Sequence, residues 1–468
     1  MTKCFCFYVY AIAVLTLSGA SVVPAFGTTI RVSPNGPIKS VTEAVNSASP
    51  GDTISVEGGV YHERIVMDKT LNLTGVDNPV IDGGGTGTVI EIKAPGSALR
   101  GFTVTGSGSR LSNEDTGILL DTAGGTLIEG NRLTDVLFGI YIKNSPHTVI
   151  RGNTIRGKDV QMTERGDGIR LWYSSGTKII DNDISVIRDL VIWWSSDTLI
   201  KGNVVEEGRY GLHYMSSNHN KFEDNVFRNN YVGGFLMYSV DIQFYGNRFV
   251  NNRGVGTGYG IGFKDLDDVV ARDNLIMDNR VGIFLDNSPY LVDSWNRISD
   301  NVIAFNDIGV SFMPSIRRNA FHENSFVDND EQVEVRGGGQ LAGNEWSSGG
   351  SGNYWSDYIG YDEDGDGIGE IPYTSESLFE SLIDAKPELR IFVFSPVAKA
   401  IELASRAFPV IKPEPKLTDE YPRVRSGIPS ELRTGGRGLQ PGLLFLSLSM
   451  VMLPLIFYGY IMKRRTGV

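Results

Sequence analysis

The chain has 468 residues and a formal net charge of −12, with 43 Lys and Arg against 55 Asp and Glu. This acidic balance disfavours nucleic acids and anionic lipid surfaces as partners, because both are negatively charged. The two cysteines, Cys4 and Cys6, both lie at the extreme amino terminus. Disulfide bonds, thiolate metal sites and cysteine nucleophiles are therefore excluded from the rest of the chain.

Residues 1–27 are predicted to form a secretory signal peptide. Lys3 supplies its positive charge, an apolar run extends to Leu17, and small residues stand at Ala25 and Gly27, where cleavage is expected. The remainder of the chain is therefore expected to fold outside the cytoplasm.

Residues 28–100 are predicted to form an amino-terminal cap and the first coils of a repeat fold. Ser40, three residues before Glu43, makes a capping box that begins a short helix ending near Asn46. Such a helix covers the open end of a stack of strands, which would otherwise pair with strands of other molecules.

An asparagine recurs through the middle of the chain. Asn203, Asn225 and Asn247 follow one another at intervals of 22 residues. The same Gly-Asn, Asp-Asn or Glu-Asn pair recurs at similar spacing at Asn131, Asn153, Asn182, Asn274, Asn301, Asn324 and Asn344. A period near 22, with short β-branched runs between turns, predicts an all-β, right-handed, single-stranded parallel β-helix of the pectin-lyase-like class over residues 28–350. Because asparagine tolerates the left-handed conformation, each of these residues is predicted to turn a corner and form a ladder there.

The alternation of side chains along strands assigns a face to each residue of a coil. With the coils aligned, Trp193 is predicted to point inward. The outward residues are polar at both ends of the solenoid but mostly apolar in its middle, at Trp172, Ile192, Trp194, His213, Met215, Phe235 and Met237. A contiguous exposed patch of this kind indicates an interaction site. Insertions near 157–166 and 254–258 are expected to form a rim beside it.

Residues 351–393 are predicted to form a carboxy-terminal cap that contains an Asp-rich loop. Asp362, Asp364 and Asp366 alternate before Gly367, and Glu370 is near, as in the first half of a calcium loop. Tyr373 stands where the bidentate Glu of such a loop is expected. The loop is therefore a candidate structural Ca²⁺ site, with a polar turn as the alternative.

Residues 394–440 are predicted to form an amphipathic helix and a Pro-rich linker. Val397, Ile401 and Phe408 recur on one side of that helix. Residues 443–462 contain no charged side chain and are followed by a basic tail, 463–468. This pattern predicts one transmembrane helix with a cytoplasmic tail, which would hold the β-helix at the cell membrane on the periplasmic or extracellular side.

His213, Met215 and Met237 are candidate ligands for copper(I), because imidazole and thioether groups select this soft ion where thiols are absent. The Cα atoms of His213 and Met215 are expected ~6.6 Å apart on one strand face. The Cα atom of Met237 is expected ~4.8 Å from that of Met215, on the next coil. Indole rings nearby can also contact a cation. The alternative is that this surface docks a partner protein, through Trp172, Ile192, Trp194 and Phe235.

Carbohydrate chemistry is the rival class, because many β-helices modify polysaccharides with clustered acids and bases. The candidate residues for such chemistry are Asp167, Arg170, Lys264, Asp265 and Asp286. They are not expected to form one cluster on neighbouring coils. We therefore predict that the chain is not an enzyme, and a carbohydrate-binding role or a noncatalytic adhesion scaffold remains as an alternative.

Three stretches resemble the NosD family of accessory proteins for nitrous oxide reductase maturation. They are GLHYMSSN at 211–218, GNYWSDYIGYDEDGDGIGEIPY at 352–373 and FSPVAKAIELASRAFPVIKPEPKLTD at 394–419. The resemblance implies a protein that pairs with the permease and ATPase of an ABC transporter. It also implies that copper(I) is received transiently from a copper chaperone lipoprotein and passed to the reductase. The helix carrying Val397, Ile401 and Phe408 becomes the candidate dock for the permease.

Overall fold

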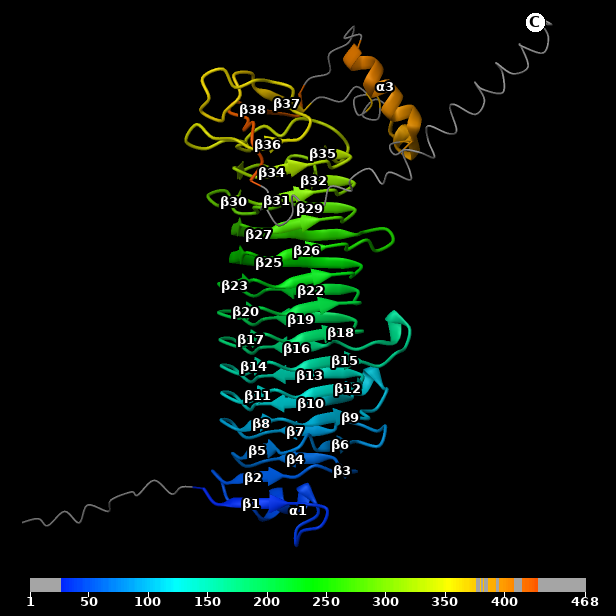
Figure 1. The fold of residues 1–468 in the computed structure, drawn as a ribbon, viewed down its shortest axis with the longest axis vertical. Coiled ribbons are helices and arrows are strands. Elements are labelled where there is room, and N and C mark those ends of the chain that lie inside the picture. The colour runs from blue at the N-terminus through cyan, green and yellow to red at the C-terminus, as the bar shows by residue number, and fades with distance from the viewer. Residues whose placement is uncertain are drawn as a thin grey trace, which may run out of the picture.

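The structure is a computed structural model that describes residues 27–375, 379, 382, 386–392, 395–407 and 415–427. The chain winds into a tall stack of coils, which Figure 1 shows from the amino-terminal end at the bottom to the carboxy-terminal cap at the top. The predicted all-β parallel β-helix is confirmed. The predicted signal peptide, apart from residue 27, lies outside the described residues, as do Phe408 and the predicted span at 443–462. In the described part of the chain, no helix is long and apolar enough to cross a membrane.

Successive coils pair in parallel to form two long sheets, one of 23 strands and one of 13. The larger sheet contains β1 (Thr29–Val32), β2 (Thr53–Val56), β4 (Ile65–Met67), β5 (Asn72–Gly75), β7 (Ile90–Ile92), β8 (Ala98–Arg100), β10 (Thr116–Asp121), β11 (Leu127–Glu129), β13 (Phe138–Lys143), β14 (Val149–Arg151), β16 (Ile169–Trp172), β17 (Lys178–Ile180), β19 (Asp189–Trp193), β20 (Leu199–Lys201), β22 (Tyr210–Met215), β23 (Asn220–Glu223), β25 (Val232–Tyr245), β27 (Tyr259–Arg272), β29 (Val281–Asp286), β30 (Asn296–Ser299), β32 (Ile308–Phe312), β33 (Asn319–His322) and β35 (Glu331–Val335). The smaller sheet contains β3 (Val60–Tyr61), β6 (Val80–Asp82), β9 (Thr103–Thr105), β12 (Arg132–Val136), β15 (Thr154–Gly157), β18 (Asp183–Ser185), β21 (Val204–Glu206), β24 (Val226–Arg228), β26 (Arg248–Val250), β28 (Leu275–Met277), β31 (Val302–Ala304), β34 (Ser325–Val327) and β36 (Tyr354–Trp355).

The larger sheet consists of two ribbons, which are joined where β25 and β27 run through a corner as single strands of 14 residues. We call one of them ribbon 1. It comprises β4, β7, β10, β13, β16, β19, β22, the first halves of β25 and β27, then β29, β32 and β35, each paired with the next. Its outward face carries the candidate site.

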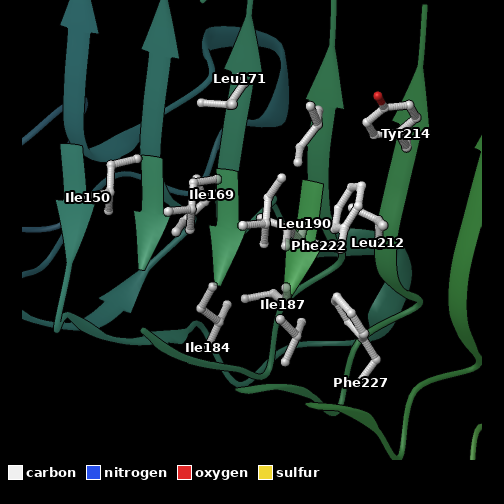
Figure 2. Close-up of a cluster of buried hydrophobic side chains, with 14 of the residues drawn as sticks. Ile150, Ile169, Leu171, Ile184, Ile187, Leu190, Leu212, Tyr214, Phe222 and Phe227 are labelled. Carbon is white, nitrogen blue, oxygen red and sulfur yellow. The ribbon is translucent and has the colours of Figure 1, made fainter. Parts of the chain in front are cut away.

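The inward residues of all coils form one continuous apolar core. Figure 2 shows part of this core, where Leu171, Leu212 and Tyr214 point into the coil from ribbon 1. Aromatic rings stack along the axis, with ring centroids 4.7 Å apart for Phe222 and Phe244. Because each coil buries its apolar residues against its neighbours, the fold is stable only as a stack.

The predicted asparagine ladder is present, but the asparagines themselves are not the left-handed residues. That conformation belongs to the preceding residue, as at Gly202 and Asp224, whose φ angles are 67° and 54°. Asn203 is instead fully buried, and its backbone N and Nδ2 donate to Oδ1 of Asn225 at 3.0 and 2.9 Å. The ladder therefore supplies acceptors for the backbone that the turn leaves unpaired.

Asn344 was predicted to belong to this ladder, and that prediction is wrong. The backbone N of Asn324 donates to Oδ1 of Asn353 at 3.1 Å, so Asn353 provides the next rung. Asn344 accepts from Asn319 at a different corner. A further ladder that the sequence reasoning missed stands five residues after the first, at Asn230, Asn252, Asn279, Asn306 and Asn329.

The two ends of the stack are covered differently. At the amino-terminal end lies α1 (Val41–Ser47), and Ser40 accepts from the backbone N of Glu43 at 3.1 Å, as predicted. Glu63 of the next coil accepts from the other amides of this first turn. At the other end, β37 (Tyr373–Ser375) pairs antiparallel with β38 (Leu417–Asp419).

Short helices occupy the connections. Two 3₁₀ helices, η1 (Leu111–Asn113) and η2 (Met162–Glu164), lie in insertions that project from the same side of the stack (Figure 1). Near the carboxy-terminal end stand a third, η3 (Pro387–Phe392), and the helix α3 (Pro396–Ala407). The predicted insertion at 157–166 thus contains a helical turn beside ribbon 1.

Candidate functional site

The strand β19 is one residue shorter than its partner β22, and this changes the predicted faces. Asp189 pairs with Tyr210 but Val191 pairs with His213, so the register shifts between them. Ile192 therefore points inward and is fully buried, and its predicted docking role is wrong. Trp193 pairs with Trp172 and Met215 on the outward face, so its predicted inward orientation is also wrong. The coil from Asn182 to Asn203 spans 21 residues, one fewer than the period of 22. The structure shows that the coil is shortened within β19, whereas the predicted faces assumed a shorter segment elsewhere in the coil.

Trp194 does not belong to the outward column where it was predicted. It has a φ of 46° and follows β19 at the turn. Its ring lies 4.6 Å from that of Trp172 and stacks on Tyr173 at 5.3 Å. Trp194 therefore extends the aromatic surface sideways, while Trp193 takes its place in the column.

The three candidate copper ligands lie on the outward face of adjacent strands. Met215 of β22 pairs with Met237 of β25, and His213 pairs with Phe235. All four side chains are partly buried. Phe235 continues into a stack with Tyr259, at 6.1 Å between ring centroids. The two thioethers and the imidazole thus share one surface, bordered by aromatic rings.

A buried carboxylate holds the imidazole of His213. Nδ1 of His213 lies 3.1 Å from Oδ2 of Asp189, whose side chain is only 1% exposed. Arg209 and the backbone N of Tyr210 donate to the same carboxylate. Burial alone would raise the pKa of Asp189, but hydrogen bonds from His213 and Arg209 outweigh it and hold the pKa below its ordinary value. Asp189 is therefore ionised, and Nδ1 of His213 carries the proton.

In the neutral imidazole, a proton on Nδ1 leaves Nε2 with its lone pair. Among the described residues, no hydrogen bond to Nε2 occurs, and the side chain is 18% exposed. The ring is fixed between Trp193 and Tyr210, each with its centroid 5.0 Å from that of His213. A histidine oriented through Nδ1 by a carboxylate is the common form of a metal-ligating histidine.

Sequence reasoning missed a cluster of buried charges beside these ligands. Arg188 donates to Oδ1 of Asp167 at 3.0 Å, and Asp167 is 1% exposed. Burial raises the pKa of Asp167 to about 6, although the charge of Arg188 opposes the shift. Oδ2 of Asp167 and Nε of Arg170 are buried without a hydrogen-bond partner in the described part of the chain. Asp167 thus lies next to Arg170 of its own coil and Arg188 of the following coil.

Arg170 lies within an aromatic enclosure. Its guanidinium carbon is 5.1 to 5.9 Å from the ring centroids of Phe138, Tyr141, Trp172 and Trp193. Glu114, from the insertion that contains η1, accepts from its Nη1 at 3.1 Å. Arg170, Arg188 and Arg209 are thus balanced by Glu114, Asp167 and Asp189. The cluster therefore exerts little net attraction on a hard multivalent cation.

The five candidates for carbohydrate chemistry fall into two groups. Asp167 and Arg170 lie 3.8 Å apart in the buried cluster. Lys264 is 2.8 Å from Asp286 and 3.4 Å from Asp265, further along ribbon 1. As expected, they do not form one cluster.

The Asp-rich loop brings three carboxylates together. Oxygens of Asp362, Asp364 and Glu370 lie within 4.8 Å of one another, which is compatible with one metal ion. Asp366 does not join this group, and its Oδ1 accepts from the backbone N of Ile368 at 2.7 Å. Three of the four predicted calcium ligands therefore converge.

Among the described side chains of α3, some are buried and others are exposed. Ala398 and Ile401 contact Phe379 and Leu389. Val397 and Leu403 are 59% and 71% exposed. Of the predicted docking residues on this helix, Val397 is thus accessible and Ile401 is half-buried.

A family model and two named relatives identify the family of this chain. The model of the family described as periplasmic copper-binding protein (NosD) matches residues 45–163 and 152–360. A probable ABC transporter binding protein NosD of Pseudomonas aeruginosa is 29% identical over 388 residues, covering 79% of this chain and 88% of its own length. The protein of the same name from Stutzerimonas stutzeri is 29% identical over 391 residues, covering 80% and 86%.

Two solved structures are similar to this chain at low sequence identity. The A-module of a mannuronan C-5 epimerase from Azotobacter vinelandii has a TM-score of 0.49 and 16% identity, over 66% of this chain and 92% of that module. A periplasmic alginate epimerase has a TM-score of 0.38 and 16% identity, over 68% of this chain and 83% of the epimerase. Because the family model covers most of the solenoid, from residue 45 to 360, the chain belongs to the NosD family.

Proposed function

We propose that this protein binds copper(I) on the outward face of ribbon 1 and hands it on during maturation of nitrous oxide reductase. The ligands are Nε2 of His213 and the thioethers of Met215 and Met237. The observation that carries the proposal is that buried Asp189 fixes His213 and leaves Nε2 free on the face that bears the paired methionines. Soft thioethers with one imidazole favour copper(I) over Ca²⁺ or Mg²⁺.

The donor set suits an ion that is cargo. Asp189 already accepts from His213 and Arg209, so the carboxylate is not available as a hard ligand. The side chains of His213, Met215 and Met237 are only partly buried, so soft ligands of a partner protein can approach the same ion from solvent. Copper can then move by exchange of one ligand at a time.

A competitive copper(I) titration against a chromogenic chelator, without oxygen, tests these ligands. The variant His213→Ala, Met215→Ala, Met237→Ala is expected to bind about 100-fold more weakly than the natural chain, because all three donors are removed. The matched control combines His219→Ala with Met277→Ala. His219 also places Nδ1 near a carboxylate, 2.9 Å from Asp241, and Met277 is partly buried on β28. Unchanged affinity in the triple variant would refute the assignment.

We further propose that α3 docks this protein on the permease of an ABC transporter. The relatives are named as ABC transporter binding proteins. Val397 and Leu403 supply exposed apolar surface on α3. The predicted span at 443–462 would hold the β-helix at the membrane, where a copper chaperone lipoprotein can deliver the ion.

Co-purification with the permease tests the dock. Val397→Asp with Leu403→Asp is expected to reduce recovery about 10-fold or more, because two charges would be buried in an apolar contact. Val255→Asp is the control, since this valine is 95% exposed and lies outside α3, in the insertion before β27. Substitution is preferable to deleting 394–419, because Asp419 is fully buried. Full recovery of the permease with the double variant would exclude α3.

A further inference from the structure

We infer that Trp193 is a further contact residue for the copper(I) cargo, with its indole covering the side of the ion that His213, Met215 and Met237 leave open. The inference rests on the proposed function. It concerns a residue that the repeat pattern of the sequence predicted to point inward.

The first argument is the place of Trp193 in the outward column. Trp193 of β19 pairs with Met215, which pairs with Met237 on the following coil. The indole centroid also lies 5.0 Å from that of His213, with the two ring planes at 86°. Trp193 therefore borders both the imidazole and the first thioether, on the side away from Met237.

The second argument is what holds the indole. Its centroid lies 5.8 Å from that of Trp172 and 6.1 Å from that of Trp194, so packing fixes the ring. No hydrogen bond does so, because Nε1 of Trp193 is buried without a partner among the described residues. A buried indole N–H is ordinarily satisfied. The N–H of Trp193 therefore does not hold the ring, and the neighbouring indoles set its position.

The third argument is chemical. The face of an indole attracts a cation, most strongly where water is excluded. The guanidinium of Arg170, 5.5 Å from the centroid of Trp193, shows that this cluster already accommodates one cation. Three donors leave one side of a copper(I) ion open to water. An indole on that side excludes water without adding a ligand bond that must break before transfer.

A purely structural role for Trp193 makes a different prediction. If the indole only supports His213, its removal weakens copper binding, but copper does not contact the ring. If the indole contacts the ion, copper(I) binding also quenches its fluorescence. Trp194 provides the internal comparison, because it belongs to the same aromatic group but stands outside the column.

The experiment is an anaerobic copper(I) titration of the full chain, read by tryptophan fluorescence and by chelator competition. Trp193→Phe is expected to weaken binding about 2- to 30-fold and to remove most of the quenching at saturation. Trp193→Leu should weaken binding further, and Trp194→Phe should leave affinity within about 2-fold. Circular dichroism establishes that each variant is folded.

The outcomes separate this inference from the proposed function. If the His213, Met215 and Met237 variant binds copper(I) as the natural chain does, the proposed function fails. If that variant loses binding while Trp193→Phe keeps the natural affinity and quenching, only the role of Trp193 fails. Weaker binding with undiminished quenching would likewise overturn direct contact and leave Trp193 as support for His213.

Discussion

The buried carboxyl of Asp167 makes the free energy of unfolding depend on pH. Burial raises its pKa to about 6, with Arg188 opposing the shift, whereas an unfolded chain titrates Asp near 3.9. Between these values the folded protein binds a proton that the unfolded chain does not. The free energy of unfolding therefore falls as the pH rises from about 4 to about 6, by about 3 kcal/mol in total. Above about pH 6, ionised Asp167 lowers the free energy of unfolding by this full amount.

Replacing the carboxyl of Asp167 tests whether its protonation causes this pH dependence. Asp167→Asn, a neutral residue of the same shape, is expected to remove about 2 to 3 kcal/mol of the difference in unfolding free energy between pH 4 and pH 7. Urea denaturation at the two pH values measures this difference. Asp135→Asn is the control, because Asp135 is 63% exposed. A variant with the full pH dependence would show that another group is responsible.

The asparagine ladder is the element that fixes the spacing of the coils near the site. Asn225 is fully buried, and its Oδ1 accepts from the backbone N and Nδ2 of Asn203. Its own Nδ2 donates to the carbonyl of Ile200 at 2.9 Å. Asn225→Ala is therefore expected to lower the free energy of unfolding by about 2 to 4 kcal/mol, because buried groups of two coils lose their partners.

Denaturant unfolding measures this loss, with Asn46→Ala as the control. Asn46 is an exposed residue of α1, outside the ladder. A decrease for Asn225→Ala no larger than that for Asn46→Ala would mean that packing, and not the ladder, holds the coils in register.

The sequence predicts the elements wherever the repeat is regular. The 22-residue spacing of Asn203, Asn225 and Asn247 was sufficient to place His213, Met215 and Met237 on one face. It failed at β19, because a coil of 21 residues does not reveal which position lacks its residue. The contact of Asp167 with Arg188 did not follow from the spacing, because these residues are 21 apart, whereas other ion pairs between coils, such as that of Lys264 with Asp286, join residues 22 apart. The second ladder was visible in the sequence, as an asparagine five residues after each of several ladder positions.

At the scale of the molecule, the carboxy-terminal segment returns to close the β-helix. Asp419 of β38 is fully buried, and its Oδ2 accepts from the backbone N of Asn353 at 2.7 Å and from Nε1 of Trp355 at 3.0 Å. The asparagine ladder thus ends on a carboxylate. In the sequence, α3 stands between β37 and β38, which pair with each other, so both chain connections of α3 lead to the end of the stack.

The Asp-rich loop contacts this returning segment, so a cation bound there is expected to stabilise the end of the molecule. The backbone N of Gly369 donates to the carbonyl of Pro422 at 2.7 Å, and that of Val424 donates to Gly367 at 3.0 Å. Ca²⁺ held by Asp362, Asp364 and Glu370 would relieve the repulsion between these carboxylates and hold the loop against the segment.

Thermal unfolding with and without millimolar Ca²⁺ measures the effect. At about 100 times its dissociation constant, a ligand specific for the folded state adds about 2.7 kcal/mol, so Tm is expected to rise by several degrees. Asp364→Asn with Glu370→Gln should abolish the rise. Asp366→Asn should retain it, because Asp366 lies in the same loop outside the converging group. If Ca²⁺ leaves Tm of the natural chain unchanged, the loop is a polar turn, and the contacts of Asp419 with Asn353 and Trp355 close this end of the β-helix without a metal.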